Sequence, residues 1–116
     1  GNPPITFLRG VMKDGAFAVL ESEIRVPVSV KAAEGTKLTL GVRPEHFSPA
    51  GDVAVPGKVT FAETQGRENL YDVRLAGGSL LRSIQPVRND ITVGDEVKWA
   101  IDSRGVFVFD EEGRRL

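Results

Sequence analysis

The sequence contains no cysteine and only one histidine, one methionine, one tryptophan and one tyrosine in 116 residues. Without cysteine the chain has no disulfide, no zinc–thiolate site and no thiol nucleophile. Because His46 stands alone, a metal site built from several histidines is excluded, and a Ser-His-Asp triad would have to use this one residue. No apolar run approaches the ~20 residues of a transmembrane helix, and the N-terminal region lacks the basic-then-apolar pattern of a signal peptide. These absences indicate a soluble domain and favour a cytoplasmic one.

An excess of charge of either sign is also missing. Fifteen Lys and Arg stand against sixteen Asp and Glu, which gives a net charge of −1. This balance argues against a basic nucleic-acid binder and against a polybasic membrane-surface module. A base-stacking platform would also need aromatic and basic residues interleaved on an exposed face, whereas the pattern puts most of the eight aromatic residues on apolar faces.

Motifs of autonomous catalysis are absent from the sequence. It has no P-loop, no dinucleotide-binding glycine motif and no nucleophile elbow. The adjacent acidic residues Glu111 and Glu112 would point their side chains to opposite sides, which favours a solvated turn over acid–base chemistry. We therefore expect no enzyme activity, no catalytic residues, and no cofactor or metal site in this chain.

What the sequence has in abundance is β-branched residues and turn formers. Fifteen Val and five Ile accompany thirteen Gly and seven Pro, and short runs alternate apolar and polar residues with the period of two that is typical of strands. In residues 58–63, Val59 and Phe61 are expected to share a face. Pro27 predicts that its strand lies at a sheet edge, because proline cannot donate to a ladder. We expect strands at residues 23–30, 37–43, 58–63, 69–75, 79–85, 96–102 and 106–109.

Turn signals such as Asp14-Gly15 and Gly77-Gly78 separate these runs, and strands every 8 to 12 residues are typical of a barrel or sandwich. Closure removes exposed edges in a small domain, so a closed or nearly closed barrel is favoured. The one helical piece expected is a short turn from Pro44 to Phe47, because proline suits a first helical position. Residues 1–4 read as a linker, since consecutive prolines stiffen the chain.

Two polar segments stand out as candidate sites. In residues 41–47, Arg43, Glu45 and His46 gather at a strand end. Their arrangement is explained either by an ion pair that holds a loop over the barrel mouth or by a recognition or dimer contact, and composition favours the ion pair. Residues 63–71 are expected to form a hairpin with Gly66 at its turn, either solvated or in contact with a ligand or subunit.

Several segments, in order along nearly the whole chain, resemble one family: the C-terminal regulatory domain of the ATP-binding subunits of bacterial ABC importers, of the MalK/UgpC type. The family's Gly-x-Pro-x-x-x-Phe-Leu-x-Gly pattern is matched by Gly1, Pro3, Phe7, Leu8 and Gly10. Its Gly-[Ile/Val]-Arg-Pro-Glu-His signature is matched by Gly41, Val42, Arg43, Pro44, Glu45 and His46. A Glu-x-x-Gly-x-Glu hairpin is matched by Glu63, Gly66 and Glu68. A Gly-Asp-x-Val segment is matched by Gly94, Asp95 and Val97, and a closing Phe-Asp-x-x-x-Gly-x-Arg-Leu segment by Phe109, Asp110, Gly113, Arg115 and Leu116.

The resemblance implies an all-β, OB-fold-like (TOBE/MOP-like) small barrel with additional strands and at most a short helical turn. It implies that residues 1–116 are a single regulatory domain, with 1–4 the end of a linker from an ATPase domain. It also implies no catalysis here, with ATP and Mg²⁺ bound elsewhere in the parent protein. The implied partners are a second ATP-binding subunit in a homodimer, the permease subunits at the inner face of the membrane and a cytoplasmic regulator, and no nucleic acid.

The residues that the resemblance marks as interface or regulatory candidates are Arg43, Pro44, Glu45, His46, Glu63, Gly66 and Glu68. The sequence departs from the family pattern at Ile5-Thr6, at residues 106–110 and at Phe47, which leaves the transported solute open. Two alternatives also remain open at this point: a barrel that senses a small ligand or oxyanion, and an OB-fold nucleic-acid-binding module.

Overall fold

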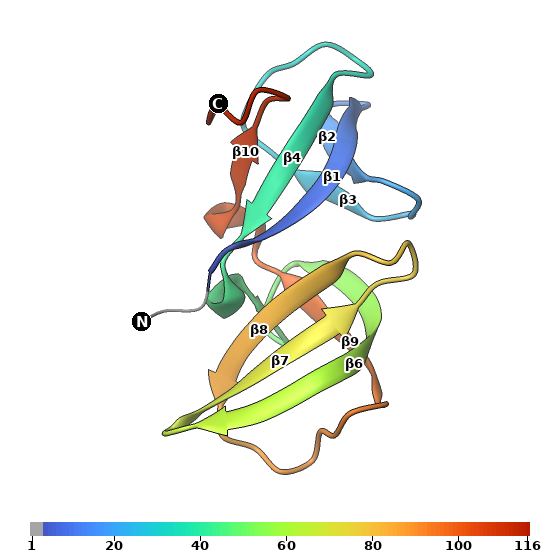
Figure 1. The fold of residues 1–116 in the computed structure, drawn as a ribbon. Helices are drawn as coiled ribbons and strands as arrows, with labels where there is room; N and C mark the ends of the chain where they lie inside the picture. Colours follow the sequence, from blue (N-terminus) through green and yellow to red (C-terminus); the bar gives the residue numbers. More distant parts are fainter. Residues whose placement is uncertain (1–3) are drawn as a thin grey trace.

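The chain forms two antiparallel five-stranded sheets in a computed structural model that describes residues 4–116. Ten strands and two one-turn 3-10 helices make up this described part, which contains no α-helix. The two sheets form two lobes along the long axis of the molecule (Figure 1). Gly1 and Pro3, and most of the expected linker at residues 1–4, lie outside the described residues.

The first sheet has the strand order β10-β4-β1-β2-β3. Its strands are β1 (Thr6–Lys13), β2 (Ala16–Val19), β3 (Arg25–Pro27), β4 (Lys37–Val42) and β10 (Phe107–Phe109). Strands β1 and β2 are joined by the two residues Asp14 and Gly15, whose φ angles of 52° and 81° fit the positive-φ turn that suits a two-residue hairpin. As Pro27 predicts, β3 lies at an edge.

The second sheet has the order β5-β9-β6-β7-β8. Its strands are β5 (Phe47–Ser48), β6 (Val53–Gln65), β7 (Glu68–Arg74), β8 (Leu80–Pro86) and β9 (Glu96–Ile101). The chain crosses between the lobes through the 3-10 turn η1 (Pro44–His46), which leads from β4 to β5. It returns through η2 (Ser103–Gly105), which leads from β9 to β10. A direct link between the sheets is the backbone N–H of Arg82, which donates to the Thr6 hydroxyl (3.4 Å).

Both sheets curl toward closure, as the expected barrel requires. In the second sheet the two outermost strands, β5 and β8, contact each other, and the Ser83 hydroxyl of β8 donates to the Phe47 carbonyl of β5. In the first sheet, β10 and the segment at 28–30 face each other across a hollow of about 260 Å³. The fold is thus a nearly closed small barrel with additional strands.

One hydrophobic core runs through both lobes, and it follows from the alternation of the strands. Tyr71, Val73 and Leu75 point inward while Asp72 and Arg74 point outward. The inward set from the first sheet packs into the same cluster. It comprises Leu8, Met12, Phe17, Val19, Val26, Leu38, Leu40, Val42 and Val108.

Several expected elements are confirmed, and others differ from the structure. The strands near 37–43, 69–75, 79–85 and 96–102 are confirmed within two residues, and the helical turn begins at Pro44 as expected but ends at His46. The strand expected at 23–30 forms a ladder only over residues 25–27, and the one expected at 58–63 is part of the 13-residue β6. Strands β1, β2 and β5 were not expected.

The expected shared face of Val59 and Phe61 is wrong. The register of β6 against β7 shifts between these two residues, so that Thr60 is the extra residue of a β-bulge. A one-residue shift turns the next side chain to the other face. Val59 is therefore buried, whereas Phe61 is 39% exposed.

The described residues 4–116 contain no helix that is long and apolar enough to cross a membrane.

Candidate functional site

The segment of residues 43–46 forms the crossing between the two lobes. Arg43 follows β4 and precedes η1 in an extended conformation (φ −72°, ψ 146°), and its carbonyl accepts from the His46 N–H (2.9 Å). Pro44 occupies the first helical position and is buried, whereas Glu45 points into solvent. The turn stops at His46 because the Phe47 N–H already donates to the Pro44 carbonyl in a β conformation. The motif therefore fixes the angle at which the chain leaves one sheet and enters the other.

His46 ties this crossing to the return crossing at η2. Its carbonyl accepts from the Asp102 N–H (2.8 Å), and its ring packs directly on Gly105, where an added Cβ would lie 2.2 Å from the ring nitrogen Nδ1. That Nδ1 atom is buried and has no hydrogen-bond partner among the described residues. Glycine at 105 is thus required by close packing against the imidazole.

The local ion pair considered from the sequence does not form. None of the salt bridges within residues 4–116 involves Arg43, Glu45 or His46. Instead the Arg43 guanidinium lies over the Phe107 ring, with 4.8 Å between the guanidinium carbon and the ring centroid. Arg115 lies over the same ring at 4.4 Å. Both distances fit cation–π contacts.

The second candidate segment is the hairpin between β6 and β7. Gln65 pairs with Glu68, and the turn consists of Gly66 and Arg67, with Gly66 at φ 63°. Glu63, Gly66 and Glu68 are all exposed. The expected hairpin is therefore confirmed, and its candidate residues form a polar tip whose Glu63 carboxylate accepts from the Gln65 side chain (3.1 Å).

A buried polar chain that the sequence reasoning missed begins below this tip. The Thr64 hydroxyl donates to the Asn69 side-chain oxygen (2.7 Å), and Asn69 Nδ2 donates to both the Tyr71 hydroxyl and the Arg88 carbonyl (2.8 Å each). Asn69 is only 5% exposed. All of its hydrogen bonds stay within the protein, which is what a buried amide requires.

The chain of polar groups continues on β8 toward the crossing. Gln85 lies opposite Asn69 in the ladder, and its Nε2 donates to the Ser83 hydroxyl (2.9 Å), which in turn donates to the Phe47 carbonyl. Arg88 donates to the Gln85 side-chain oxygen (3.2 Å). The hydrogen bond from the Ser83 side chain thus joins the outermost strands β5 and β8 of the second sheet, in the place of a backbone ladder.

The two candidate segments are therefore joined through the interior but do not converge on one point. No hydrogen bond or ion pair within residues 4–116 links residues 43–46 directly to Glu63, Gly66 or Glu68. The same part of the chain has no cluster of three or more His, Asp or Glu placed to hold a metal ion.

Two carboxylates, Asp52 and Asp102, accept hydrogen bonds from residues of η2. Asp52 accepts from the Ser103 hydroxyl (2.6 Å) and the Ser103 N–H (2.8 Å), and these hydrogen bonds lower the pKa of Asp52 below its ordinary value. Asp102 accepts from the side chain and the backbone N–H of Arg104, which lowers the pKa of Asp102 in the same way. Both groups favour their charged forms in the folded state.

Replacing Ser103 with alanine is expected to raise the pKa of Asp52 part of the way toward its ordinary value, because it removes the hydroxyl hydrogen bond, the largest cause of the lowering, and keeps the backbone N–H one. A carboxyl group whose pKa is lowered on folding stabilises the protein above its unfolded pKa of about 3.9, and this stabilisation is lost as the pH falls through the folded pKa. The advantage of the wild type over Ser103→Ala should therefore be present at neutral pH and fade in acid. A carboxyl-carbon NMR titration measures it, with Asp90, whose pKa is lowered to about 2 by Arg88, as the unaffected control.

Two family models match the chain. The TOBE domain matches residues 40–109, and the MalK OB fold domain matches residues 1–47. The MalK OB fold match therefore covers β1 to β4 and η1, and the TOBE match covers the end of β4 and every later element from η1 to β10.

Curated relatives align over nearly all of the chain. It is 29% identical to the lactose transport ATP-binding protein LacK of Rhizobium radiobacter, over 100% of this chain and 35% of that protein. It is 32% identical to the maltose/maltodextrin import ATP-binding protein MalK of Vibrio cholerae (93% and 31%). It is 34% identical to the sn-glycerol-3-phosphate import ATP-binding protein UgpC of Cereibacter sphaeroides (100% and 33%). The chain thus spans about a third of the length of these relatives.

Among solved structures, a crystal form of the cytoplasmic molybdate-binding protein ModG matches with a TM-score of 0.69. The match covers 93% of this chain and 96% of that one at 12% sequence identity. At this identity the likeness concerns the fold, and it agrees with the small-barrel architecture expected from the sequence.

Proposed function

Because this chain belongs to the TOBE domain family and carries the MalK OB fold, we propose that it is the C-terminal regulatory and dimerisation domain of the ATP-binding subunit of a bacterial ABC importer for sugars or glycerol-phosphate-like solutes. The observation that carries this proposal is the extent of the alignments. Three import or transport ATP-binding proteins align over 93% to 100% of this chain but only over about a third of their own length.

In this role the domain contributes contact surfaces and no chemistry. ATP and Mg²⁺ bind in the ATPase part of the parent subunit, which lies on the inner face of the membrane beside the permease subunits. The rigid connection between the two lobes supports the role, since η1 and η2 are locked together by His46 and Gly105. A contact made at residues 43–46 is thereby fixed in position relative to both lobes.

The reading frame that encodes this chain tests the assignment. We expect a G-x-x-x-x-G-K-[ST] phosphate-binding loop in frame and upstream, because such a loop cradles the phosphates of ATP. A frame with no such loop would contradict the proposal. Binding of molybdate or sulfate by the chain, seen as a rise in melting temperature, would instead favour the alternative of an oxyanion-sensing barrel.

Replacing both Arg43 and Glu45 with alanine in the full-length subunit is expected to weaken dimerisation or the response to a regulator. Hydrogen bonds to charged groups contribute about 1.5–3 kcal/mol. We therefore expect the dissociation constant of the dimer to rise about tenfold or more. Sedimentation equilibrium measures the dimer, and inhibition of solute uptake measures the regulation.

The matched control replaces Arg74, an exposed arginine of β7, and should change neither measurement. If the double variant dimerises, transports and is inhibited like the wild type, residues 43–46 serve only as the crossing between the lobes.

A further inference from the structure

The outer face of the first sheet gathers the three phenylalanines Phe7, Phe107 and Phe109. The register places Phe7, Gly41 and Phe107 in one row across β1, β4 and β10. Directly opposite residues of an antiparallel pair share a face. The next row contains Phe109 beside Thr39. These rings thus lie together on the face that points away from the core.

Gly41 makes this cluster possible. A Cβ at this position would lie 3.0 Å from Phe109 and 3.5 Å from Phe7, so the absent side chain lets both rings close over the strand. The two rings meet edge to face, with 5.8 Å between centroids and 71° between planes. Phe7 remains 55% exposed, and Phe107 and Phe109 are half-buried. The cluster is packed edge to face yet open to solvent.

Arginines surround the cluster and lack acidic partners. The guanidinium carbons of Arg43 and Arg115 both lie within 5 Å of the Phe107 ring centre. Within residues 4–116 neither side chain donates a hydrogen bond or forms an ion pair. Stacking on an aromatic ring holds a guanidinium plane in place while its N–H edge stays free for a carboxylate. We call this surface the aromatic–cationic face, which comprises Phe7, Arg9, Arg43, Phe107, Phe109 and Arg115.

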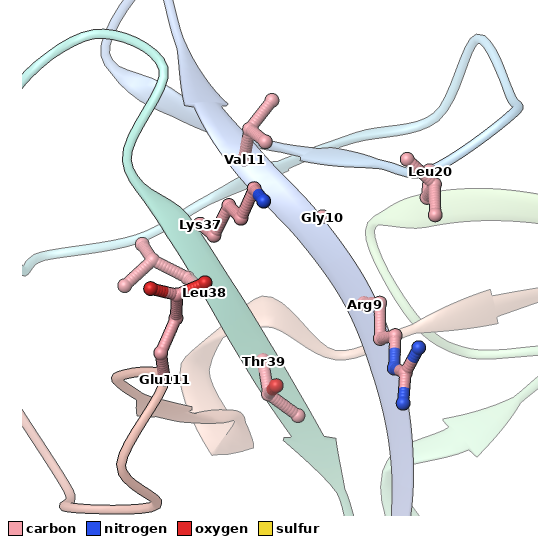
Figure 2. Close-up of a pocket in the computed structure, with 8 residues that line it drawn as sticks. All are labelled: Arg9, Gly10, Val11, Leu20, Lys37, Leu38, Thr39 and Glu111. Carbon is pink, nitrogen blue, oxygen red and sulfur yellow. The ribbon is translucent and has the colours of Figure 1, made fainter.

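The positive character extends along the sheet beyond the rings. A hollow of about 570 Å³ lies over β1 and β4 and is lined by Arg9 and Lys37 among others (Figure 2). Figure 2 shows that Glu111, the single acidic residue of its lining, reaches toward β4 from the C-terminal loop. Neither Arg9 nor Lys37 forms a salt bridge within the described part of the chain. On a chain of net charge −1 this face is a local concentration of unpaired cations.

We propose that the aromatic–cationic face docks an acidic protein segment that carries apolar side chains between its carboxylates. The carboxylates would pair with Arg43 and Arg115, and the apolar side chains would cover Phe7 and Phe109. Nucleic acid fits less well, because base stacking needs free ring faces. Here two guanidiniums already lie over the Phe107 ring, and Phe7 and Phe109 stand edge to face against each other.

The proposal adds a partner chemistry to the contact role proposed for Arg43. It rests on that role only through this residue, and its test needs neither ATP nor a second subunit. If the peptide described next does not bind, the dimerisation proposal is unaffected. If the dimerisation proposal is disproved, the peptide result is unaffected.

The test uses a short labelled peptide rich in glutamate and leucine, and the same peptide with glutamine in place of glutamate. Fluorescence anisotropy at low salt is expected to show binding of the glutamate peptide alone, weakening as salt screens the charges. Arg43→Lys and Arg115→Lys keep the charge but lose the planar fork, so each should weaken binding about tenfold. Arg74→Lys on the second sheet is the matched control and should leave the affinity unchanged.

Four results would overturn the proposal. The first is no binding of the glutamate peptide, and the second is equal binding of the glutamine peptide. The third is an equal loss of affinity in Arg74→Lys. The fourth is a single-stranded oligonucleotide or inorganic phosphate that competes fully for the same residues in an NMR shift map, which would assign the face to nucleic acid or to a free anion. Spectra of each folded variant confirm that a lost affinity is not a lost fold.

Discussion

Replacing Trp99 with alanine is expected to lower the free energy of unfolding by about 3–5 kcal/mol, the range observed for large aromatic residues truncated in a core. Trp99 is 5% exposed, and it packs edge to face against Tyr71 (5.1 Å between ring centroids) and Phe47 (6.0 Å). The indole thus lies between the strand that follows η1 and the strand that carries the buried polar chain. Its loss would leave a cavity at the point where these two parts of the candidate site meet.

Urea unfolding followed by circular dichroism measures this cost. Val93→Ala is the control, because Val93 is 57% exposed and such a surface change should stay within about 0.5 kcal/mol. We also expect the NMR signals of Phe47 and His46 to shift in the Trp99 variant, since the packing of Phe47 holds the end of the turn. A cost below about 1 kcal/mol would mean that the core around Trp99 closes without it.

The elements that were predictable from the sequence are those whose alternation is clean. In β7, Tyr71 and Val73 alternate with Asp72 and Arg74, and both the strand and its buried face follow from the period of two. Pro27 identified an edge strand because its backbone has no N–H to donate. Gly66 identified a hairpin turn for a different local reason, which is the positive φ that glycine adopts easily.

The first two strands escaped prediction because their residues do not alternate cleanly between apolar and polar. In β1 the inward positions carry Leu8, Gly10 and Met12, while the outward ones include Phe7 and Val11, so apolar residues occur on both sides. Gly10 further blurs the pattern. It occupies an inward position without a side chain, because the Phe17 ring fills that space.

The candidate site was only partly predictable, because pairing between distant strands is not written in local patterns. The family signature identified Arg43 to His46, but nothing local indicated that Phe107 would lie under Arg43. That contact depends on β10 pairing with β4 across more than sixty residues. Likewise, Asn69 and Gln85 looked like ordinary strand residues, and only their opposite positions in the β7–β8 ladder make them a buried polar pair.

Because Gly105 lies in close contact with His46, replacing it with alanine is expected to lower the free energy of unfolding and to affect function. In Gly105→Ala the new Cβ would lie 2.2 Å from Nδ1 and 2.7 Å from Cγ of the imidazole, so the ring or η2 must move. Overpacking of this kind typically costs about 1–3 kcal/mol. Because His46 ends η1, the displacement should also change the position of Arg43 over Phe107 and weaken whatever this face contacts.

A double-mutant cycle separates this steric effect from a general loss of stability. His46→Ala removes the ring atoms that the new Cβ would meet, so Gly105→Ala should cost less on the His46→Ala background than on the wild type, with a coupling of about 0.5–3 kcal/mol. Urea midpoints of the four proteins measure it. If the two costs simply add, the imidazole does not hold the two crossings together. A favourable coupling would instead show that one histidine and one glycine set the angle between the lobes, and with it the position of Arg43 on the aromatic–cationic face.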